Sequence, residues 1–171
     1  MRGSRKMGAR LTALATPAVA LLLSGCFLVF EKGLSSLEGR YAVEVAPNWV
    51  EVTAGGADNS WRQEQSGAII YTDSNCEHHF EDSPLDRLVE AQASALENRE
   101  LLSKSELRLV GRAALTSRHR GLLDGVLVSL TTTVVKRSSC VYDFVMIGPP
   151  ELEQGDIDAY EQLLASFRVE L

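Results

Sequence analysis

The segment from Cys76 to Asp82 contains the densest group of metal-ligating side chains in the sequence, Cys-Glu-His-His-Phe-Glu-Asp. Thiolate, imidazole and carboxylate groups are the usual ligands of zinc. Adjacent side chains of an extended segment point to opposite sides, so His78 and His79 are poorly placed to bind one ion together. His78, His79 and Glu81 are therefore weak metal candidates, and a polar loop leading into a helix is the commoner arrangement. We expect no metal and no other cofactor.

Cys26 ends a segment that is typical of bacterial export signals. Four basic side chains and no acidic ones precede a short apolar stretch from Leu11 to Leu23. A helix of this length spans about 20 Å, less than the roughly 30 Å of hydrocarbon in a bilayer, so we expect no permanent membrane-spanning helix. The sequence Leu23-Ser24-Gly25-Cys26 resembles the lipobox of bacterial lipoproteins. The resemblance implies cleavage between Gly25 and Cys26 and lipidation of Cys26; an ordinary secretory signal or a buried core helix is the alternative.

The lipobox also divides the chain. Residues 1–25 become the signal peptide, residues 26–38 a lipidated tether of at most about 40 Å, and residues 39–171 a single domain. Two or three acyl chains give a stable membrane anchor. Phe27 follows the cysteine at the position where lipoproteins of the Gram-negative inner membrane usually carry Asp. The resemblance therefore implies the outer membrane, facing the periplasm, if the organism has one.

Cys76 and Cys140 remain once Cys26 is assigned to lipidation. Compartments beyond the inner membrane favour disulfides, so we expect these two cysteines to pair. A loop of this length is stabilised by roughly 4 kcal/mol in the chain-entropy description. Two unpaired buried thiols are the alternative, and pairing would remove Cys76 from any metal site.

The sequence beyond Gly25 is strongly acidic. All 23 Asp and Glu residues lie there, whereas four of the 17 Lys and Arg residues precede it, which leaves a net charge of −10. This charge repels nucleic acid and anionic lipid headgroups, so basic proteins, cations or neutral ligands are the expected partners. Arg112, Arg118 and Arg120 share one side of a predicted strand and form a candidate partner patch, although solvated strand faces are commoner. His119, on the opposite side, is expected to be a partly buried, hydrogen-bonded histidine rather than a catalytic base.

Alternating segments and turn residues predict strands at 40–45, 49–53, 61–65 and 68–73 before any helix. Ser83 and Pro84 predict the cap and first position of a helix, which apolar spacing extends to a point between Asn98 and Ser103. A strand from Glu106 that bends at Gly111, strands at 126–136 and 140–147, and a helix over 152–167 complete the prediction.

The strand at 140–147 is apolar on both faces, which is typical of a strand inside a sheet that is covered on both sides. Helices must supply both covers. The sequence therefore predicts an α+β fold, an α/β/α sandwich in which helices flank a central antiparallel sheet of about six or seven strands.

The order of these elements resembles the PsbP-type fold. The residues that carry the resemblance are Gly-Arg-Ala-Ala-Leu at 111–115, the Asp124-Gly125 hairpin, the hydrophobic strand and a closing helix that ends in Ala165-Ser166-Phe167. The resemblance covers roughly Leu37 to Leu171. This group includes the extrinsic PsbP subunit of photosystem II, a Ran-binding nuclear import factor and many small bacterial lipoproteins. None of the motifs is catalytic, and one fold hosts many roles.

The sequence contains no Gly-x-Ser-x-Gly elbow, Cys-x-x-Cys pair, phosphate-binding glycine loop or His-Glu-x-x-His helix, so we expect no enzyme. The leading hypothesis is a membrane-anchored, non-enzymatic accessory or protein-interaction module of an envelope complex. The alternative is a carrier or sensor of a small ligand or metal ion. It requires an apolar pocket between sheet and helix, lined by Trp49, Trp61 or Tyr142, although these aromatics are more simply core residues.

Overall fold

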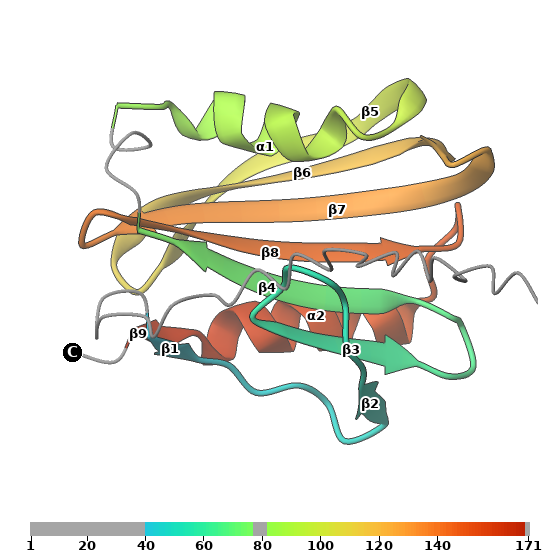
Figure 1. Cartoon of the computed structure of the whole chain (residues 1–171), viewed down its shortest axis with the longest axis horizontal. Coiled ribbons are helices and arrows are strands. Elements are labelled where there is room, and N and C mark those ends of the chain that lie inside the picture. The colour runs from blue at the N-terminus through green and yellow to red at the C-terminus, as the bar shows by residue number, and fades with distance from the viewer. Residues whose placement is uncertain (1–39, 77–81, 170–171) are drawn as a thin grey trace, which may run out of the picture. The chain divides into compact units, whose positions relative to one another are not determined.

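The computed structural model describes residues 40–76 and 82–169 (Figure 1). Seven strands form one antiparallel sheet in the order β2-β3-β4-β8-β7-β6-β5. Its strands are β2 (Trp49–Glu51), β3 (Asn59–Gln63), β4 (Ile69–Asn75), β5 (Glu97–Leu109), β6 (Arg112–Leu123), β7 (Val126–Arg137) and β8 (Cys140–Gly148). The predicted antiparallel sheet of six or seven strands is confirmed.

One helix covers each face of this sheet (Figure 1). The helix α1 (Leu85–Ala93) packs on β6 and β7, and α2 (Gln154–Ser166) covers the opposite face. Phe144 of β8 lies in one core cluster with Tyr160 of α2, whereas Val141, on the other face of β8, packs with Val89 of α1. The strand that is apolar on both faces is thus covered by helices on both sides, which confirms the α/β/α sandwich.

The first helix is shorter and the next strand longer than the sequence predicted. α1 ends at Ala93, and β5 begins at Glu97 instead of Glu106. The chain between them passes close to β6, where a Cβ atom added to Gly121 would lie 2.9 Å from the Leu96 Cβ atom. Pairing with β6 therefore turns a segment of helix-forming residues into a strand.

Two local predictions about turns and caps are wrong. Ser83 does not cap α1: Pro84 is the N-cap residue, and the Ser83 carbonyl accepts a hydrogen bond from Lys136 Nζ at 3.0 Å. Gly111 does not bend one continuous strand but forms a hairpin turn with Val110, between β5 and β6. Both turn residues have positive φ, 44° and 78°, and this geometry matches the twist of paired strands.

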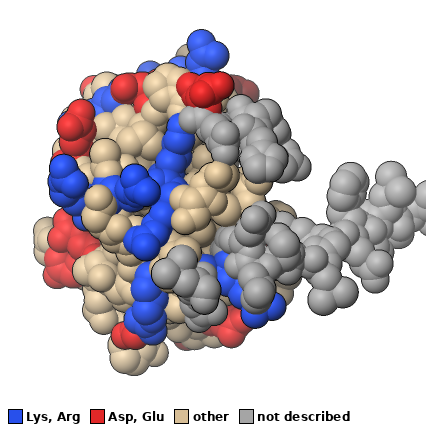
Figure 2. Space-filling model, turned by 90° about the vertical axis from the view of Figure 1, so that its left-hand side faces the viewer, with Lys and Arg blue, Asp and Glu red and all other residues tan. Residues whose placement is uncertain are grey.

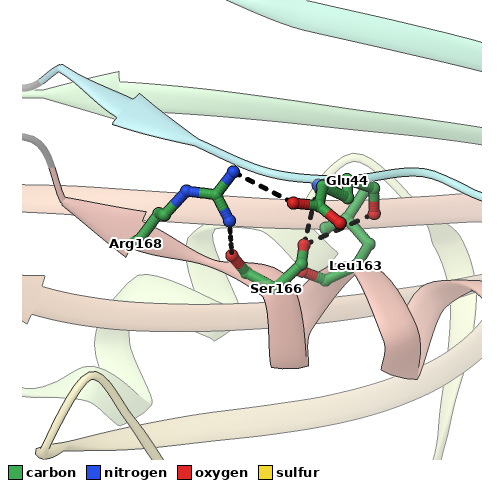
Figure 3. A network of polar contacts seen from close by, with 4 residues as sticks. All are labelled: Glu44, Leu163, Ser166 and Arg168. Carbon is green, nitrogen blue, oxygen red and sulfur yellow. Dashed lines mark hydrogen bonds and ion pairs between the residues drawn. The ribbon is translucent and has the colours of Figure 1, made fainter.

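The first and last described residues of the chain lie at the same end of the domain. β1 (Tyr41–Ala42) pairs with β9 (Arg168–Val169), so the predicted strand over 40–45 is shorter than expected. Figure 3 shows how the next residues are held: the Glu44 backbone N–H donates to Ser166 Oγ at 2.7 Å, and the Glu44 carboxylate pairs with Arg168 at 3.0 Å. The first described residues are therefore fixed against the C-terminal end of α2.

Candidate functional site

A groove of about 580 Å³ runs between α2 and the strands β5, β6 and β7. Its residues come from both layers: Ser103, Ser105 and Leu107 of β5, Thr116 and Arg118 of β6, Thr131 of β7, and Ile157, Glu161 and Leu164 of α2. The strand residues share the side of the sheet that faces α2, because Ser103 pairs with Arg118 and Ser105 with Thr116. The groove exists because α2 covers only part of this face.

Arg118 supplies a positive charge to the groove. Its Nε atom donates to Thr131 Oγ1 at 3.4 Å, and within the described part of the chain its terminal nitrogens make no hydrogen bond or ion pair. Behind it, Tyr160 Oη bonds Thr133 Oγ1 at 2.9 Å and donates to the Phe144 carbonyl at 2.8 Å. Burial raises the pKa of Tyr160 well above its usual value, so the hydroxyl stays protonated. The groove therefore offers a partly apolar lining with a guanidinium that can bind a carboxylate.

The strand β5 forms one wall of this groove and is the last strand of the sheet. Its residues from Glu97 to Glu106 are all exposed. Between Ser103 and Leu109 its pairing with β6 has no bulge, and in the described chain no strand pairs with its outer edge. An open edge of this kind is a template for another extended segment.

The helix α1 fixes the other face of β5. Asp86 forms an ion pair with Lys104, and Glu90 pairs with Arg99 at 2.9 Å. These two ion pairs join α1 to β5 at Arg99 and Lys104, whereas the bulges in the pairing with β6 lie before Ser103. The regular second half of the strand is thus the part that borders the groove.

Basic side chains gather at the end of the sheet where β5 turns into β6 and β7 turns into β8. Arg112, Lys136 and Arg137 line a shallow pocket of about 210 Å³ there. Arg137 Nη1 donates to the Val110 carbonyl at 2.8 Å, and Arg108 Nη1 contacts the Gly111 carbonyl at 3.4 Å. Figure 2 looks onto this end of the domain and shows a stripe of Lys and Arg side chains with acidic residues around it.

The disulfide between Cys76 and Cys140 lies at the same end. Cys140 is 1% exposed and directly follows the turn formed by Ser138 and Ser139. The bond joins the segment after β4 to the start of β8, so Cys76 has no thiolate to offer a metal ion.

Two carboxylates lie opposite each other on the α1 side of the sheet. Asp73 of β4 pairs in register with Asp143 of β8, whose Oδ2 atom accepts a hydrogen bond from Gln92 Nε2 at 2.9 Å. Burial raises the pKa of Asp143 to about 6, the Gln92 hydrogen bond opposes this shift, and Asp73 adds to it. A pocket of about 390 Å³ beside them is lined by Asp73, Tyr71, Gln92 and the Gly55-Gly56 loop. Asp143 therefore takes up a proton at a higher pH than an ordinary aspartate does.

His119 lies beneath α1 and is 2% exposed. Its Nε2 atom is 3.8 Å from Glu90 Oε1, and its Nδ1 atom has no hydrogen-bond partner within the described residues. Burial lowers the pKa of His119 from the ordinary histidine value, an effect that Glu90 partly offsets. It is more deeply buried than predicted and lies on the opposite side of the sheet from the groove.

The fold defined by this geometry occurs in several solved structures. LpqN of Mycobacterium tuberculosis, a protein involved in cell envelope biogenesis, has a TM-score of 0.55 and 12% identity, over 76% of this chain and 84% of LpqN. The Ran-binding protein Mog1p of Saccharomyces cerevisiae has a TM-score of 0.55 and 11% identity, over 78% and 96% of the two chains. Cyanobacterial PsbP of Synechocystis has a TM-score of 0.51 and 12% identity, over 81% and 96%. This chain has a PsbP/Mog1-like α+β fold.

Likeness at such low identity establishes the fold alone. No protein-family model matches the chain, and no curated protein matches it in sequence. Among the described residues, no helix is long and apolar enough to cross a membrane, and no group of three or more His, Cys, Asp or Glu side chains is placed to hold a metal ion.

Several predicted site residues lie outside the described part of the chain. These are Cys26 with its cleavage site after Gly25, and the weak metal candidates His78, His79 and Glu81. Their roles remain predictions.

The three arginines of the predicted patch are spread along β6, and Arg118 and Arg120 are two residues apart on the same side of the strand. Arg112 is exposed at the basic end of the sheet, Arg118 lines the groove, and Arg120 donates to the Pro150 carbonyl at 3.3 Å beyond it. Roughly 20 Å of strand separates Arg112 from Arg118, and the role of the three arginines as a partner patch stays a prediction.

The aromatic residues that were candidates for a ligand pocket belong to the core. Trp49 and Tyr142 are buried, and Trp61 packs against the same cluster. The groove between sheet and helix lies elsewhere, toward β5. The sequence singled out Arg118 but not the β5 residues of the groove, because a strand predicted to start at Glu106 omits Ser103 and Ser105.

Proposed function

We propose that the protein is a lipid-anchored, non-enzymatic accessory module that binds a protein of the cell envelope through β5 and the adjoining groove. The observation that supports this most directly is the open outer edge of Ser103–Leu109 beside a partly apolar groove. A partner segment that adds to β5 as a strand would satisfy its backbone hydrogen bonds. Alternate side chains of that segment would then cover the groove.

The chemistry of the groove suggests what the partner carries. Arg118 has terminal nitrogens that make no bond within the described residues, and Glu161 is exposed on the opposite wall. An extended segment with an acidic side chain among apolar ones fits this lining, because a carboxylate can accept both guanidinium N–H groups. Support also comes from the similar fold of LpqN, a protein involved in cell envelope biogenesis.

Site-specific photocrosslinking in intact cells tests the partner. A photoreactive amino acid at Ser103 should capture one protein, and the same amino acid at exposed Arg62 of β3 serves as the control. Arg118→Gln should weaken the Ser103 crosslink while the variant still unfolds cooperatively. An equal yield of the crosslinked protein from Ser103 and Arg62 would contradict binding at the groove. A Ser103 crosslink that Arg118→Gln does not weaken would contradict it too.

Intact mass of the protein purified from membranes tests the anchor separately. We expect a chain that begins at Cys26 and carries acyl chains, and we expect Cys26→Ala to leave the protein unprocessed by the lipoprotein pathway. A membrane-free chain of unmodified mass would contradict anchoring without deciding the role of β5.

The second candidate function is a carrier or sensor of a small ligand. The groove favours it, because about 580 Å³ lies within the usual range of ligand sites, roughly 300 to 1,000 Å³. Arg118 would then bind a carboxylate of an amphipathic molecule. Native mass spectrometry of freshly purified protein should show a retained ligand that Arg118→Gln releases; an empty protein throughout would favour the partner-binding role.

A further inference from the structure

At the basic end of the domain, Arg112, Lys136 and Arg137 line the small pocket. Arg108, which also lines the groove, lies beside them and contacts the Gly111 carbonyl. Arg108 and Arg112 are both exposed and lie on either side of the turn formed by Val110 and Gly111. Within the described chain Arg112 makes no hydrogen bond or ion pair, so its charge is available to a partner. Figure 2 shows a stripe of Lys and Arg side chains on the face that includes this end of the domain, so the excess of acidic residues is not spread evenly.

The described chain starts at this same end. The ring of Tyr41 lies 5.5 Å from that of Tyr142, measured between centroids, and Tyr142 is two residues from Cys140 at the turn of β7 and β8. β1 is fixed there by its pairing with β9 and by the contacts of Glu44 with Ser166 and Arg168 (Figure 3). The first described residues of the domain therefore lie beside the basic end.

The basic end is also a stiff surface. Arg137 joins the turn of β7 and β8 to the Val110 carbonyl of the neighbouring turn. The Cys76–Cys140 disulfide fixes the start of β8, immediately after the turn between β7 and β8. Such a surface presents its charges without a large ordering cost on binding.

We propose that the basic end lies against the anionic headgroups of the membrane in which the protein is anchored. This orientation rests on the proposed lipid anchor at Cys26. The acidic majority of the domain does not prevent it, because charges more than about 8 Å away are largely screened at physiological ionic strength. An acidic protein could bind the same charges, but the described chain starts at this end, so an anchor at Cys26 would bring the bilayer close to it.

Hydrogen exchange of the purified full-length lipoprotein in vesicles tests the orientation. Two vesicle types are compared, phosphatidylcholine alone and phosphatidylcholine with about 30% phosphatidylglycerol. We expect amides at 108–112 and 136–140 to exchange roughly threefold more slowly in the anionic vesicles. About 0.5 M NaCl should remove the difference.

Charge reversal supplies the matched variants. Arg108→Glu combined with Arg112→Glu should abolish the slowing, whereas Arg62→Glu on exposed β3 should leave it unchanged. Acylated protein with equal exchange in both vesicle types would overturn the orientation and leave the anchor intact. Crosslinking of the basic end to a protein in native membranes, without any effect of phosphatidylglycerol, would also overturn it.

The intact mass of the protein in the same samples shows whether it is acylated. If it is not acylated, flotation with anionic vesicles tests the contact between the basic end and the lipid by itself. Binding that charge reversal abolishes would support this contact, and an absence of binding would overturn it.

Discussion

Arg137 and Val110 connect two hairpin turns of the sheet through a hydrogen bond of 2.8 Å from the guanidinium to the backbone carbonyl. Val110 has a φ of 44°, in the left-handed region that β-branched residues avoid. The turn is held in this conformation by contacts outside its own sequence. One of these is the bond from Arg137, and another is the packing of Val110 against the core cluster.

Arg137→Met should lower the free energy of unfolding by about 1 to 2 kcal/mol, because it removes a charged hydrogen bond while retaining most of the side-chain stem. Urea unfolding without reductant measures the change. Arg62→Met at an exposed β3 position is the control and should stay within about 0.5 kcal/mol of the parent protein. Equal values for the two variants would show that the bond does not stabilise the turn.

Ser138→Asn with Ser139→Gly should stabilise the protein. Both serines have positive φ, 53° and 63°, in a two-residue hairpin turn for which Asn-Gly is the favoured sequence. We expect a gain of about 1 kcal/mol and a rise in Tm of roughly 2 to 4 °C.

The turn between β6 and β7 offers the comparison. Asp124 and Gly125 have φ of 49° and 79°, and Asp-Gly already suits this geometry. Asp124→Asn should therefore leave Tm nearly unchanged. A double serine variant that melts at or below the parent temperature would contradict the strain assigned to Ser138 and Ser139.

Reduction of the Cys76–Cys140 bond should cost up to about 4 kcal/mol, since it frees a loop with a sequence separation of 64 residues in the unfolded chain. Denaturant unfolding with and without reductant measures the loss. The variant with Cys76→Ser and Cys140→Ala controls for reagent effects, because reductant should not change its stability. If reductant shifts this variant as much as the parent, the disulfide is not the cause.

The extent to which sequence predicts this fold depends on where each strand's pairing partner lies. β8 could be recognised because its burial on both faces requires apolar residues at every position except Asp143. β5 could not, since its exposed residues are rich in Glu, Arg, Leu and Lys, which favour helices in isolation. Its strand conformation comes from pairing with β6, a contact that local sequence patterns do not encode.

The candidate site was only partly predictable for the same reason. Arg118 and its neighbours were placed correctly on one side of a strand, but the groove also requires the position of α2 and the true start of β5. The special environment of Asp143 could not be predicted, because a single acidic residue in an apolar strand forms no motif. That environment depends on the pairing of Asp143 with Asp73, which only the tertiary structure shows.

Asp143 should make the stability of the protein depend on pH in an unusual direction. Burial raises its pKa from 3.8 to about 6, so the folded state binds this proton more tightly than the unfolded state does. The contribution of this proton to the free energy of unfolding is fully present below about pH 4, and it is lost as the pH rises through about 6. The loss approaches roughly 3 kcal/mol by pH 7.5, as an order of magnitude.

Asp143→Asn isolates this contribution. The amide carries no charge at any pH and keeps an oxygen that can accept the hydrogen bond from Gln92. We expect the unfolding free energy of the variant, minus that of the parent, to increase between about pH 4 and pH 7.5. His119 titrates with the opposite sign, because its folded pKa is lowered, but it is present in both proteins and cancels in the difference. A difference that stays constant with pH would show that Asp143 titrates alike in the folded and unfolded chains.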